Sequence, residues 1–247
     1  MAHTCSKREM REKVYFIPGT MCTEKLWLPT WKTISNEVRS DFEFVHLPIA
    51  EGKPLDSIVR DFGSIICSEP GHVIGFSLGG YIAGKLAIEF YTKIKKLMIV
   101  SNSLAALPET EIALRLATLK WLSLNNYSGL ATKRILEQIH PESYANHSLV
   151  ACMKQMDADL GQASLIHQLS VSTERDDIAS IVCQKVESLA FVVGDADPLV
   201  NTACLNEILA CFPQHALSTI ASCGHLLPLE RPEQFAKLIT SWLQKGV

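Results

Sequence analysis

The stretch Gly75-Phe76-Ser77-Leu78-Gly79-Gly80 decides the fold of this chain. It has the pattern G-x-S-x-G and follows the apolar run His72-Val73-Ile74, so we expect a sharp turn from a buried strand into a helix. Such a turn holds the Ser77 hydroxyl clear of the backbone, but it strains the backbone and leaves no room for neighbouring side chains. Gly75 and Gly79 fit this requirement. Because serines between glycines also occur in ordinary loops, the rest of the chain has to decide whether Ser77 is a nucleophile.

Short apolar runs alternate with helical patterns through both ends of the chain. The runs are continuous, which indicates strands buried on both faces, as in a parallel sheet. The expected strands are 14–17, 42–47, 73–76, 97–100, 189–193 and 216–220. Helical spacing recurs at 205–212 and 235–243, and helix starts are expected at Pro29, as an early helical proline, and at Asp56, as an N-cap. This alternation predicts an α/β fold with a doubly wound, mostly parallel sheet.

One region interrupts the alternation. Residues 105–181 contain helical patterns at 109–124, 129–139 and 148–170 but no convincing strand. A helical insertion after one strand of a parallel sheet is most simply a lid over the carboxyl ends of the strands, where such sheets bind ligands. We therefore expect a core made of residues 1–104 and 182–247 and a helical lid at 105–181.

The composition excludes several classes of protein. The 247 residues are 47% hydrophobic and carry a net charge of -3 with mixed signs, which argues against a nucleic-acid partner. The polar N-terminus and the lack of a long apolar run predict a cytoplasmic protein without a membrane span. The eight cysteines form no C-x-x-C pair and the histidines show no H-x-x-x-H spacing, so we expect reduced thiols, no metal and no cofactor.

Three groups in the order serine, acid, histidine supply the parts of a nucleophilic site. A serine nucleophile needs a base, and the base needs an acceptor that orients it. Ser77 is followed by Asp195 and Asp197 after the strand at 189–193, and by His225 after the strand at 216–220. Because the carboxyl ends of parallel strands meet at one edge, these side chains are expected to converge there. The sequence therefore favours Ser77 as nucleophile and His225 as base, with either aspartate as the acid.

On these motifs the chain resembles the α/β-hydrolase fold superfamily over nearly its full length, as a small serine esterase with a helical lid. The resemblance implies that the acid is Asp197, which stands three residues after the glycine that ends its strand, with Asp195 as the alternative. It also implies an oxyanion hole made by the backbone amides of Leu78 and Thr20, with Met21 as the alternative to Thr20. Many relatives have His-Gly before this position, whereas this chain has Pro18-Gly19.

The resemblance implies hydrolysis of a small carboxylic ester through an acyl-enzyme. A serine nucleophile argues against the branches that use a carboxylate, which are the haloalkane dehalogenases and epoxide hydrolases. Thioester cleavage, lyase chemistry and C–C bond hydrolysis share the triad, and Arg115 could hold a carboxylate for the last of these. A slow-turnover ligand sensor of the same fold is a further alternative.

The chain is also similar to the pimeloyl-carrier-protein methyl ester esterases, which raises an acyl-carrier-protein partner. Such a partner would favour a basic lid, but residues 105–181 hold six bases and nine acids. The balance therefore gives this partner little support.

The remaining candidates surround the predicted site. Five residues are expected to line the substrate pocket, with core packing as the alternative for the methionines: Met21, Phe76, Arg115, Met153 and Met156. Cys22 and Cys223 lie close by and are either reactive thiols or, as their apolar neighbours favour, packed and inert. His167 in the lid is expected at the surface.

Overall fold

The computed structural model describes residues 11–244; the polar stretch at residues 1–9, with Cys5, lies outside them. Six strands form one sheet in the order β2-β1-β3-β4-β5-β6, and every neighbouring pair is parallel. Their bounds are Glu12–Ile17 for β1, Phe42–His46 for β2, Gly71–Phe76 for β3, Ile94–Val100 for β4, Leu189–Gly194 for β5 and Ala216–Ile220 for β6. The predicted doubly wound α/β fold is confirmed, and each expected strand overlaps an observed one.

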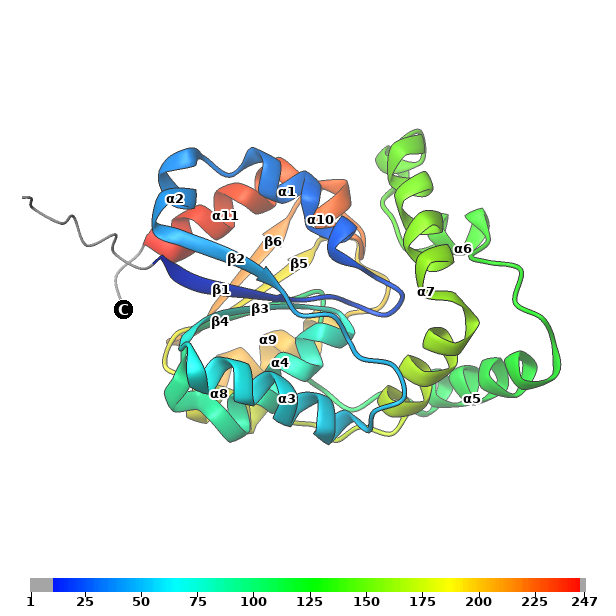
Figure 1. Cartoon of the computed structure of the whole chain (residues 1–247), viewed down its shortest axis with the longest axis horizontal. Helices are drawn as coiled ribbons and strands as arrows, with labels where there is room; N and C mark the ends of the chain where they lie inside the picture. Colours follow the sequence, from blue (N-terminus) through cyan, green and yellow to red (C-terminus); the bar gives the residue numbers. More distant parts are fainter. Residues whose placement is uncertain (1–10, 245–247) are drawn as a thin grey trace, which may run out of the picture.

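Helices cover both faces of the sheet (Figure 1). One face carries α1 (Leu28–Thr33), α2 (Asn36–Asp41), α10 (Leu227–Glu230) and α11 (Pro232–Gln244). The other carries α3 (Leu55–Ser68), α4 (Leu78–Phe90), α8 (Ala179–Lys185) and α9 (Thr202–Cys211). Successive strand residues alternate between the two cores: in β1, Val14 and Phe16 pack with Trp27, whereas Tyr15 and Ile17 pack on the α3 and α4 side. This two-sided burial is why the strands are continuously apolar.

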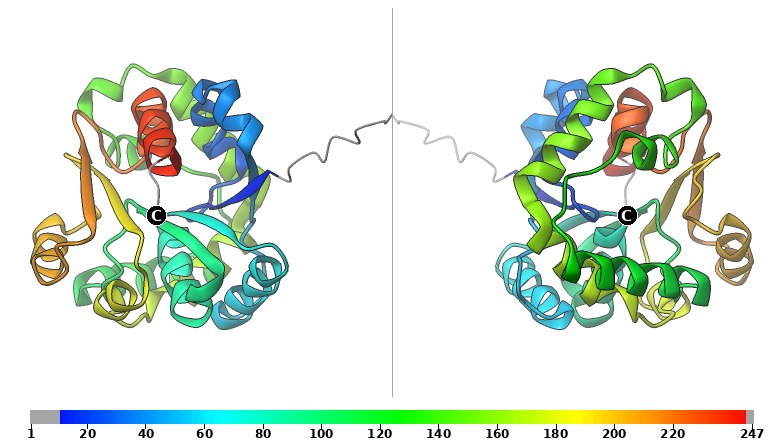
Figure 2. Two further views of the ribbon diagram at one scale, coloured as in Figure 1. Left: turned by 90° about the vertical axis from the view of Figure 1, so that its left-hand side faces the viewer. Right: turned by 90° about the vertical axis from the view of Figure 1, so that its right-hand side faces the viewer.

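The inserted helices α5 (Glu109–Leu124), α6 (Thr132–Leu136) and α7 (His147–Thr173) stand at the carboxyl ends of the strands (Figures 1 and 2). Gly161 interrupts α7 with a left-handed φ of 74°. The helix expected at 129–139 is shorter than predicted, because Gly129 has a φ of 96° and the Leu130 amide donates to the Asp157 carboxylate instead. Helix α8 spans the predicted lid boundary at 181 and packs against α4.

One predicted helix start is wrong. Helix α3 begins at Leu55 after Pro54, so Asp56 is not its N-cap but lies in its first turn. There the Asp56 carboxylate pairs with the Lys85 ammonium of α4 at 2.7 Å, which lowers the pKa of Asp56. The acid still suits the positive end of the helix dipole, so the residue type fits the position although the predicted role does not.

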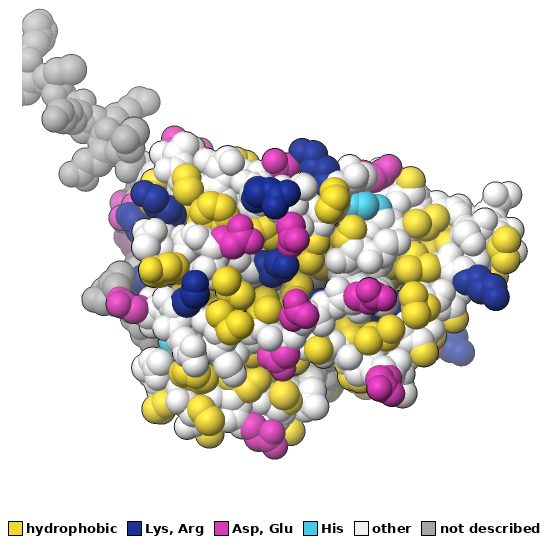
Figure 3. Space-filling model, turned by 90° about the horizontal axis from the view of Figure 1, so that it is seen from below, with side chains coloured by type: hydrophobic (Ala, Val, Ile, Leu, Met, Phe, Trp, Pro, Cys, Tyr) yellow, Lys and Arg dark blue, Asp and Glu magenta, His cyan; other side chains and the backbone are white. Residues whose placement is uncertain are grey.

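The surface seen from below carries acidic and basic side chains interspersed with apolar ones (Figure 3). Among residues 11–244, no helix is both long and apolar enough to cross a membrane. Within the same residues the seven cysteines are free thiols.

Candidate active site

Ser77 occupies a strained turn between β3 and α4. Its φ of 50° and ψ of -116° are rare for a residue with a side chain. Two contacts hold the strain: the Ser77 N–H donates to the Val100 carbonyl at 2.8 Å, and the Asn102 amide donates to the Ser77 carbonyl at 2.9 Å. Both partners belong to β4 or the loop after it. The turn is therefore fixed by β4 together with the loop that follows it.

The two flanking glycines have a steric reason. A Cβ on Gly75 would overlap the carbonyl oxygen of Gly79, and a Cβ on Gly79 would overlap the carbonyl oxygens of Ile17 and Pro18. The backbone after β1 thus passes directly beside the turn. This close approach explains why the turn has glycine on both sides of Ser77.

The side chains of Ser77, His225 and Asp197 form one hydrogen-bonded series. The Ser77 Oγ lies 3.0 Å from His225 Nε2, and His225 Nδ1 lies 3.0 and 2.9 Å from the two carboxylate oxygens of Asp197. Because an ionised carboxylate only accepts, the Nδ1–H donates to Asp197, and Nε2 is then free to accept from the Ser77 hydroxyl. The side chain of His225 is 6% exposed and that of Asp197 is 0% exposed. The series is therefore nearly closed to solvent at its inner end.

Asp197 and Asp195 differ in what they contact. Burial raises the pKa of Asp197, but the charge and hydrogen bond of His225 and the amides of Leu199 and Val200 outweigh burial and leave this pKa below its ordinary value. The Asp195 carboxylate instead accepts the backbone N–H groups of Ser222 and Cys223, at 3.0 Å each. These bonds lower the pKa of Asp195. Only Asp197 reaches the imidazole, while Asp195 fixes the loop that carries it.

A buried carboxylate organises the His225 loop, and the sequence pattern did not reveal its role. Glu230 is 5% exposed, and its two oxygens accept the backbone N–H groups of Gly224 and Leu226, all at 3.1 Å. The same carboxylate accepts the His140 N–H at 2.8 Å and the Ser143 hydroxyl at 3.0 Å, both from the lid. The signal was present: Glu230 is a lone acid after the apolar segment 226–229, and a buried acid needs partners.

The lid also touches the histidine itself. The His225 N–H donates to the Gln138 carbonyl of the lid at 2.7 Å, and the Ser101 hydroxyl donates to the His225 carbonyl at 3.0 Å. The backbone of His225 is thus held between the end of β4 and the inserted helices. The position of the imidazole depends on both.

The loop after β1 runs beside the Ser77 turn and contains two of the candidate oxyanion donors, Thr20 and Met21. The Thr20 amide donates to no group among residues 11–244. The Leu78 amide begins α4, where N–H groups have no partner inside the helix. In contrast, the Met21 amide already donates to the Gln168 side chain at 2.8 Å. Of the two alternatives in this loop, only the Thr20 amide is unoccupied.

The candidate pocket residues are mostly buried. Phe76 is 1% exposed and its ring centroid lies 5.3 Å from that of His225, while Met153 and Met156 pack in the core cluster that contains Trp27. Arg115 donates to the Glu111 carboxylate at 2.7 Å and to the Ser172 hydroxyl at 3.2 Å. The role of these residues and of Met21 in substrate binding stays a prediction.

The two nearby thiols are packed. Cys22 and Cys223 are both buried. Burial is the main cause that raises the pKa of Cys22 to about 12, and burial also raises the pKa of Cys223. Since the thiolate is the reactive form, both thiols have the character of inert core residues. His167 is partly buried, with Nε2 2.7 Å from the Lys53 carbonyl.

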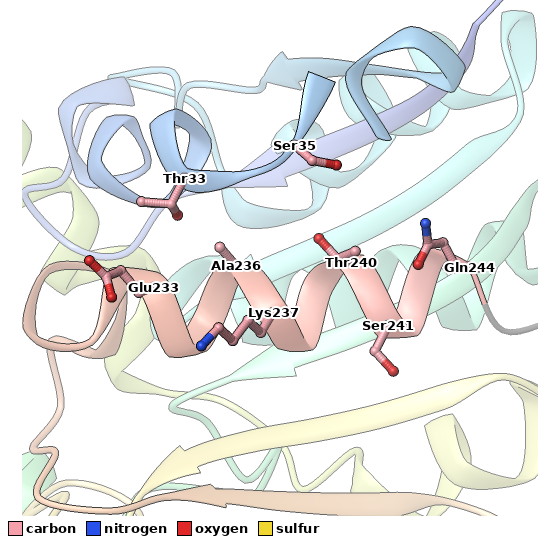
Figure 4. A pocket seen from close by; sticks show the side chains of 8 residues that line it. All are labelled: Thr33, Ser35, Glu233, Ala236, Lys237, Thr240, Ser241 and Gln244. Atoms are coloured by element: carbon pink, nitrogen blue, oxygen red, sulfur yellow. The ribbon is translucent and has the colours of Figure 1, made fainter. Parts of the chain in front are cut away.

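A groove of about 690 Å³ lies away from these residues, between α1 and α11 (Figure 4). It is lined by Thr33, Ser35, Glu233, Ala236, Lys237, Thr240, Ser241 and Gln244. None of the candidate site residues lines it. Among the described residues, no group of three histidine, cysteine or acidic side chains could hold a metal ion.

Comparison with known proteins identifies the family. The model of the Alpha/beta hydrolase family matches residues 14–238. The chain belongs to the alpha/beta hydrolase family. A search of curated protein sequences finds no match to this hydrolase.

Solved structures share the fold of this hydrolase at low sequence identity. A thermophilic esterase from Thermogutta terrifontis has a TM-score of 0.80 at 16% identity, covering 94% of this chain and 89% of the other. The enol-lactonase from Burkholderia xenovorans LB400 has a TM-score of 0.78 at 11% identity, covering 97% and 94%. A bromoperoxidase from Bacillus anthracis has a TM-score of 0.75 at 13% identity, covering 96% and 93%. At these identities the likeness shows the fold alone.

Proposed function

We propose that this hydrolase cleaves small carboxylic esters through an acyl-enzyme intermediate. The observation that carries the proposal is the series of hydrogen bonds from the Ser77 hydroxyl through His225 to Asp197, at 3.0 and 2.9 Å. Three features support the proposed roles: Ser77 lies on a strained turn, His225 Nε2 lies within hydrogen-bond reach of the Ser77 hydroxyl, and the buried Asp197 carboxylate binds the other imidazole nitrogen.

In the first half of the reaction, the Ser77 Oγ attacks the carbonyl carbon of the ester while His225 Nε2 takes the hydroxyl proton. The imidazolium that forms is stabilised by the Asp197 carboxylate. The carbonyl oxygen becomes an oxyanion, which the backbone amides of Thr20 and Leu78 bind. Because these amides are fixed before the reaction, they stabilise the charge without rearranging, and losing one such donor costs about 3–4 kcal/mol of barrier.

The intermediate then collapses. The bond to the alcohol oxygen breaks, His225 gives its proton to that oxygen, and the acyl group stays on Ser77. In the second half, a water molecule attacks the acyl carbon while His225 takes its proton. The bond to the Ser77 Oγ breaks, the proton returns to Ser77, and the carboxylic acid leaves.

Two observations favour an ester over the other substrates that suit the same triad. Two of the similar structures are an esterase and an enol-lactonase, and a lactone is a cyclic ester. Arg115, the candidate carboxylate holder of a C–C bond hydrolase, already has the Glu111 carboxylate as its partner. A slow ligand sensor would use the same residues but release product much more slowly, so the turnover rate distinguishes a sensor from an esterase.

The test is a panel of p-nitrophenyl esters of increasing acyl length, run on the wild type and on Ser77→Ala. The wild type should turn over many times per enzyme, whereas Ser77→Ala should lose hydrolysis and keep its thermal transition. A fluorophosphonate probe should add its mass to the peptide that contains Ser77. Labelling elsewhere, or activity in Ser77→Ala, would refute the mechanism, and a single turnover per enzyme would favour the sensor.

A further inference from the structure

The loop after β1 is held by a side chain from the lid. Gln168, in the second half of α7, is 2% exposed, and its Oε1 accepts the Met21 N–H at 2.8 Å. Since an N–H can face only the oxygen of a side-chain amide, this contact fixes the direction in which the Gln168 amide points. The two residues are 147 positions apart in the chain.

The accepted N–H belongs to a residue in an unusual conformation. Met21 has a φ of 53°, a region that residues with a side chain adopt when their surroundings hold them there. On one side the loop is closed by the Cys22 N–H, which donates to the Gly19 carbonyl at 3.1 Å. On the other side, the loop is held by the hydrogen bond from the Met21 N–H to the Gln168 side chain. The peptide unit between Thr20 and Met21, whose N–H binds Gln168, is therefore fixed from within the loop and from the lid.

Gln168 is itself braced. The Ser172 hydroxyl donates to the backbone carbonyl of Gln168 at 2.6 Å, and the Arg115 guanidinium donates to the Ser172 hydroxyl at 3.2 Å. Arg115 is in turn paired with Glu111 at 2.7 Å. A continuous set of contacts thus runs from α5 through α7 to the loop.

The loop meets α7 at two further points. The Thr23 N–H lies 3.4 Å from the Met156 sulfur, and the Lys25 ammonium lies 2.6 Å from the Asp159 carboxylate. Every second residue from Met21 to Lys25 is therefore in contact with one lid helix. The path of this loop depends on where α7 lies.

We propose that Gln168 is a positioning residue for the oxyanion hole. By binding the Met21 amide, it fixes the peptide unit next to Thr20 and so sets the direction of the Thr20 N–H. The hole is complete while α7 rests on the loop, which couples the transition-state contacts to the position of the lid. This inference rests on the proposed function and adds a residue that touches neither the substrate nor the reacting atoms.

The test is Gln168→Met, which keeps the length of the side chain and removes the carbonyl. We expect kcat on a short p-nitrophenyl ester to fall about tenfold, less than the roughly 10²–10³-fold that losing a donor outright costs, with KM nearly unchanged. Inhibition by a boronic acid is a second measure of the oxyanion hole. Its boron forms a bond to the Ser77 Oγ while His225 takes the hydroxyl proton. One oxygen of the resulting tetrahedral anion then occupies the oxyanion hole. The inhibition constant of the boronic acid should rise by the same factor.

Ser164→Ala is the matched control. Ser164 lies one turn before Gln168 on α7, is 5% exposed, and donates to the Glu51 carboxylate at 2.6 Å. It also joins the lid to the core, but at the loop after β2. Its removal should leave kcat and the boronic acid constant within about twofold of wild type. Equal losses in both variants would mean that any loosening of the lid lowers activity, and would overturn the role of Gln168.

Two further results bear on the role of Gln168. An unchanged kcat and boronic acid constant in Gln168→Met would refute the inference, while fluorophosphonate labelling of wild-type Ser77 would leave the proposed function standing. If Gln168→Met does not fold, hydrogen exchange of the wild type gives the answer. The Met21 amide should exchange as slowly as the amides of α7. Fast exchange at Met21 beside a protected α7 would contradict the contact.

Discussion

The turn at Ser77 and the two loops that face it are held in different ways. The turn is fixed by the neighbouring strand β4 and the loop that follows it, through Val100 and Asn102. The loop that contains Met21 and the loop that contains His225 are fixed in part by the lid, through Gln168, Gln138 and the residues bonded to Glu230. The core alone thus holds Ser77, the proposed nucleophile, whereas the proposed base His225 and the proposed oxyanion donor Thr20 lie in loops that also depend on the inserted helices.

This difference indicates which parts of the site should respond to mutations in the lid. Loss of a lid contact should leave the strained turn at Ser77 intact, so the Ser77 side chain keeps its orientation. The same loss should disturb the hydrogen bond to His225 and the direction of the Thr20 amide. Turnover should therefore respond to the lid more than the accessibility of Ser77 does.

The largest effect is expected at the acid, which lies on the core side of the comparison. Asp197→Asn should lower kcat by about 10⁴-fold, because the amide favours the wrong tautomer of His225. Asp195→Asn should have a much smaller effect, since it changes a loop contact and leaves the acceptor of the imidazole in place. Steady-state kinetics of both variants on one ester checks this. A greater loss in the Asp195 variant would reverse the assignment of the acid.

Substitution of Glu230 tests how far the loop that contains His225 depends on its contacts with the lid. In the wild type, backbone N–H groups donate to the Glu230 carboxylate. In Glu230→Gln, an NH₂ group replaces one of the accepting oxygens and faces these N–H groups, so the free energy of unfolding should fall by about 2–3 kcal/mol. Turnover should fall as well, because the variant loosens the loop of His225. Urea denaturation and ester hydrolysis measure the two effects.

Glu142→Gln is the control for Glu230. The Glu142 carboxylate is 64% exposed and pairs with Arg231 at 3.1 Å, in the same region of the lid. Because the Glu142 carboxylate is largely in solvent, the pair contributes about 0–1 kcal/mol, so this variant should be nearly as stable as the wild type. If the two variants were equally stable, Glu230 would not be the organising contact of the loop.

The smallest effect concerns the thiols of the two lid-dependent loops. Because the pKa of Cys22 is raised to about 12 and that of Cys223 is also raised, both are protonated at pH 8 and should react slowly with iodoacetamide. The exposed Cys67 and Cys211 should react first, with activity retained. Peptide mass spectrometry over time gives the order. Alkylation of Cys22 as fast as Cys211 would show that the loop after β1 opens readily in the native protein.

The sequence predicts well those features that depend on neighbouring residues in the chain. The apolar runs located all six strands, although only the four inner strands are largely buried and the edge strands β2 and β6 are partly exposed. The order of the motifs after these strands predicted that Ser77 and His225 lie close together. The role of Asp56 was wrong because an N-cap and a first-turn residue differ by one position and both suit an acid. The extent of α6 was wrong because the Asp157 carboxylate, 27 residues away, takes the Leu130 amide.

What the sequence could not predict depends on contacts between distant segments. Gln168 is a polar residue in a helix, a pattern typical of a solvated face, and only the packing of α7 on the loop after β1 buries it. Glu230 stands in the motif that contains His225, but its partners His140 and Ser143 come from the lid. Neither spacing nor periodicity carries information about which lid residues reach the core.

The break in α7 at Gly161 has a consequence for how such an enzyme can diversify. A Cβ at Gly161 would meet nothing within 4 Å, so the left-handed φ of 74°, and not lack of space, demands glycine. The first half of the helix carries Met153 and Met156, which are candidates for the substrate pocket, while the second half carries Gln168. Met156 and Asp159 of the first half also contact the loop after β1, so both halves of the helix hold this loop, but a change at Met153 need not rotate the half that carries Gln168.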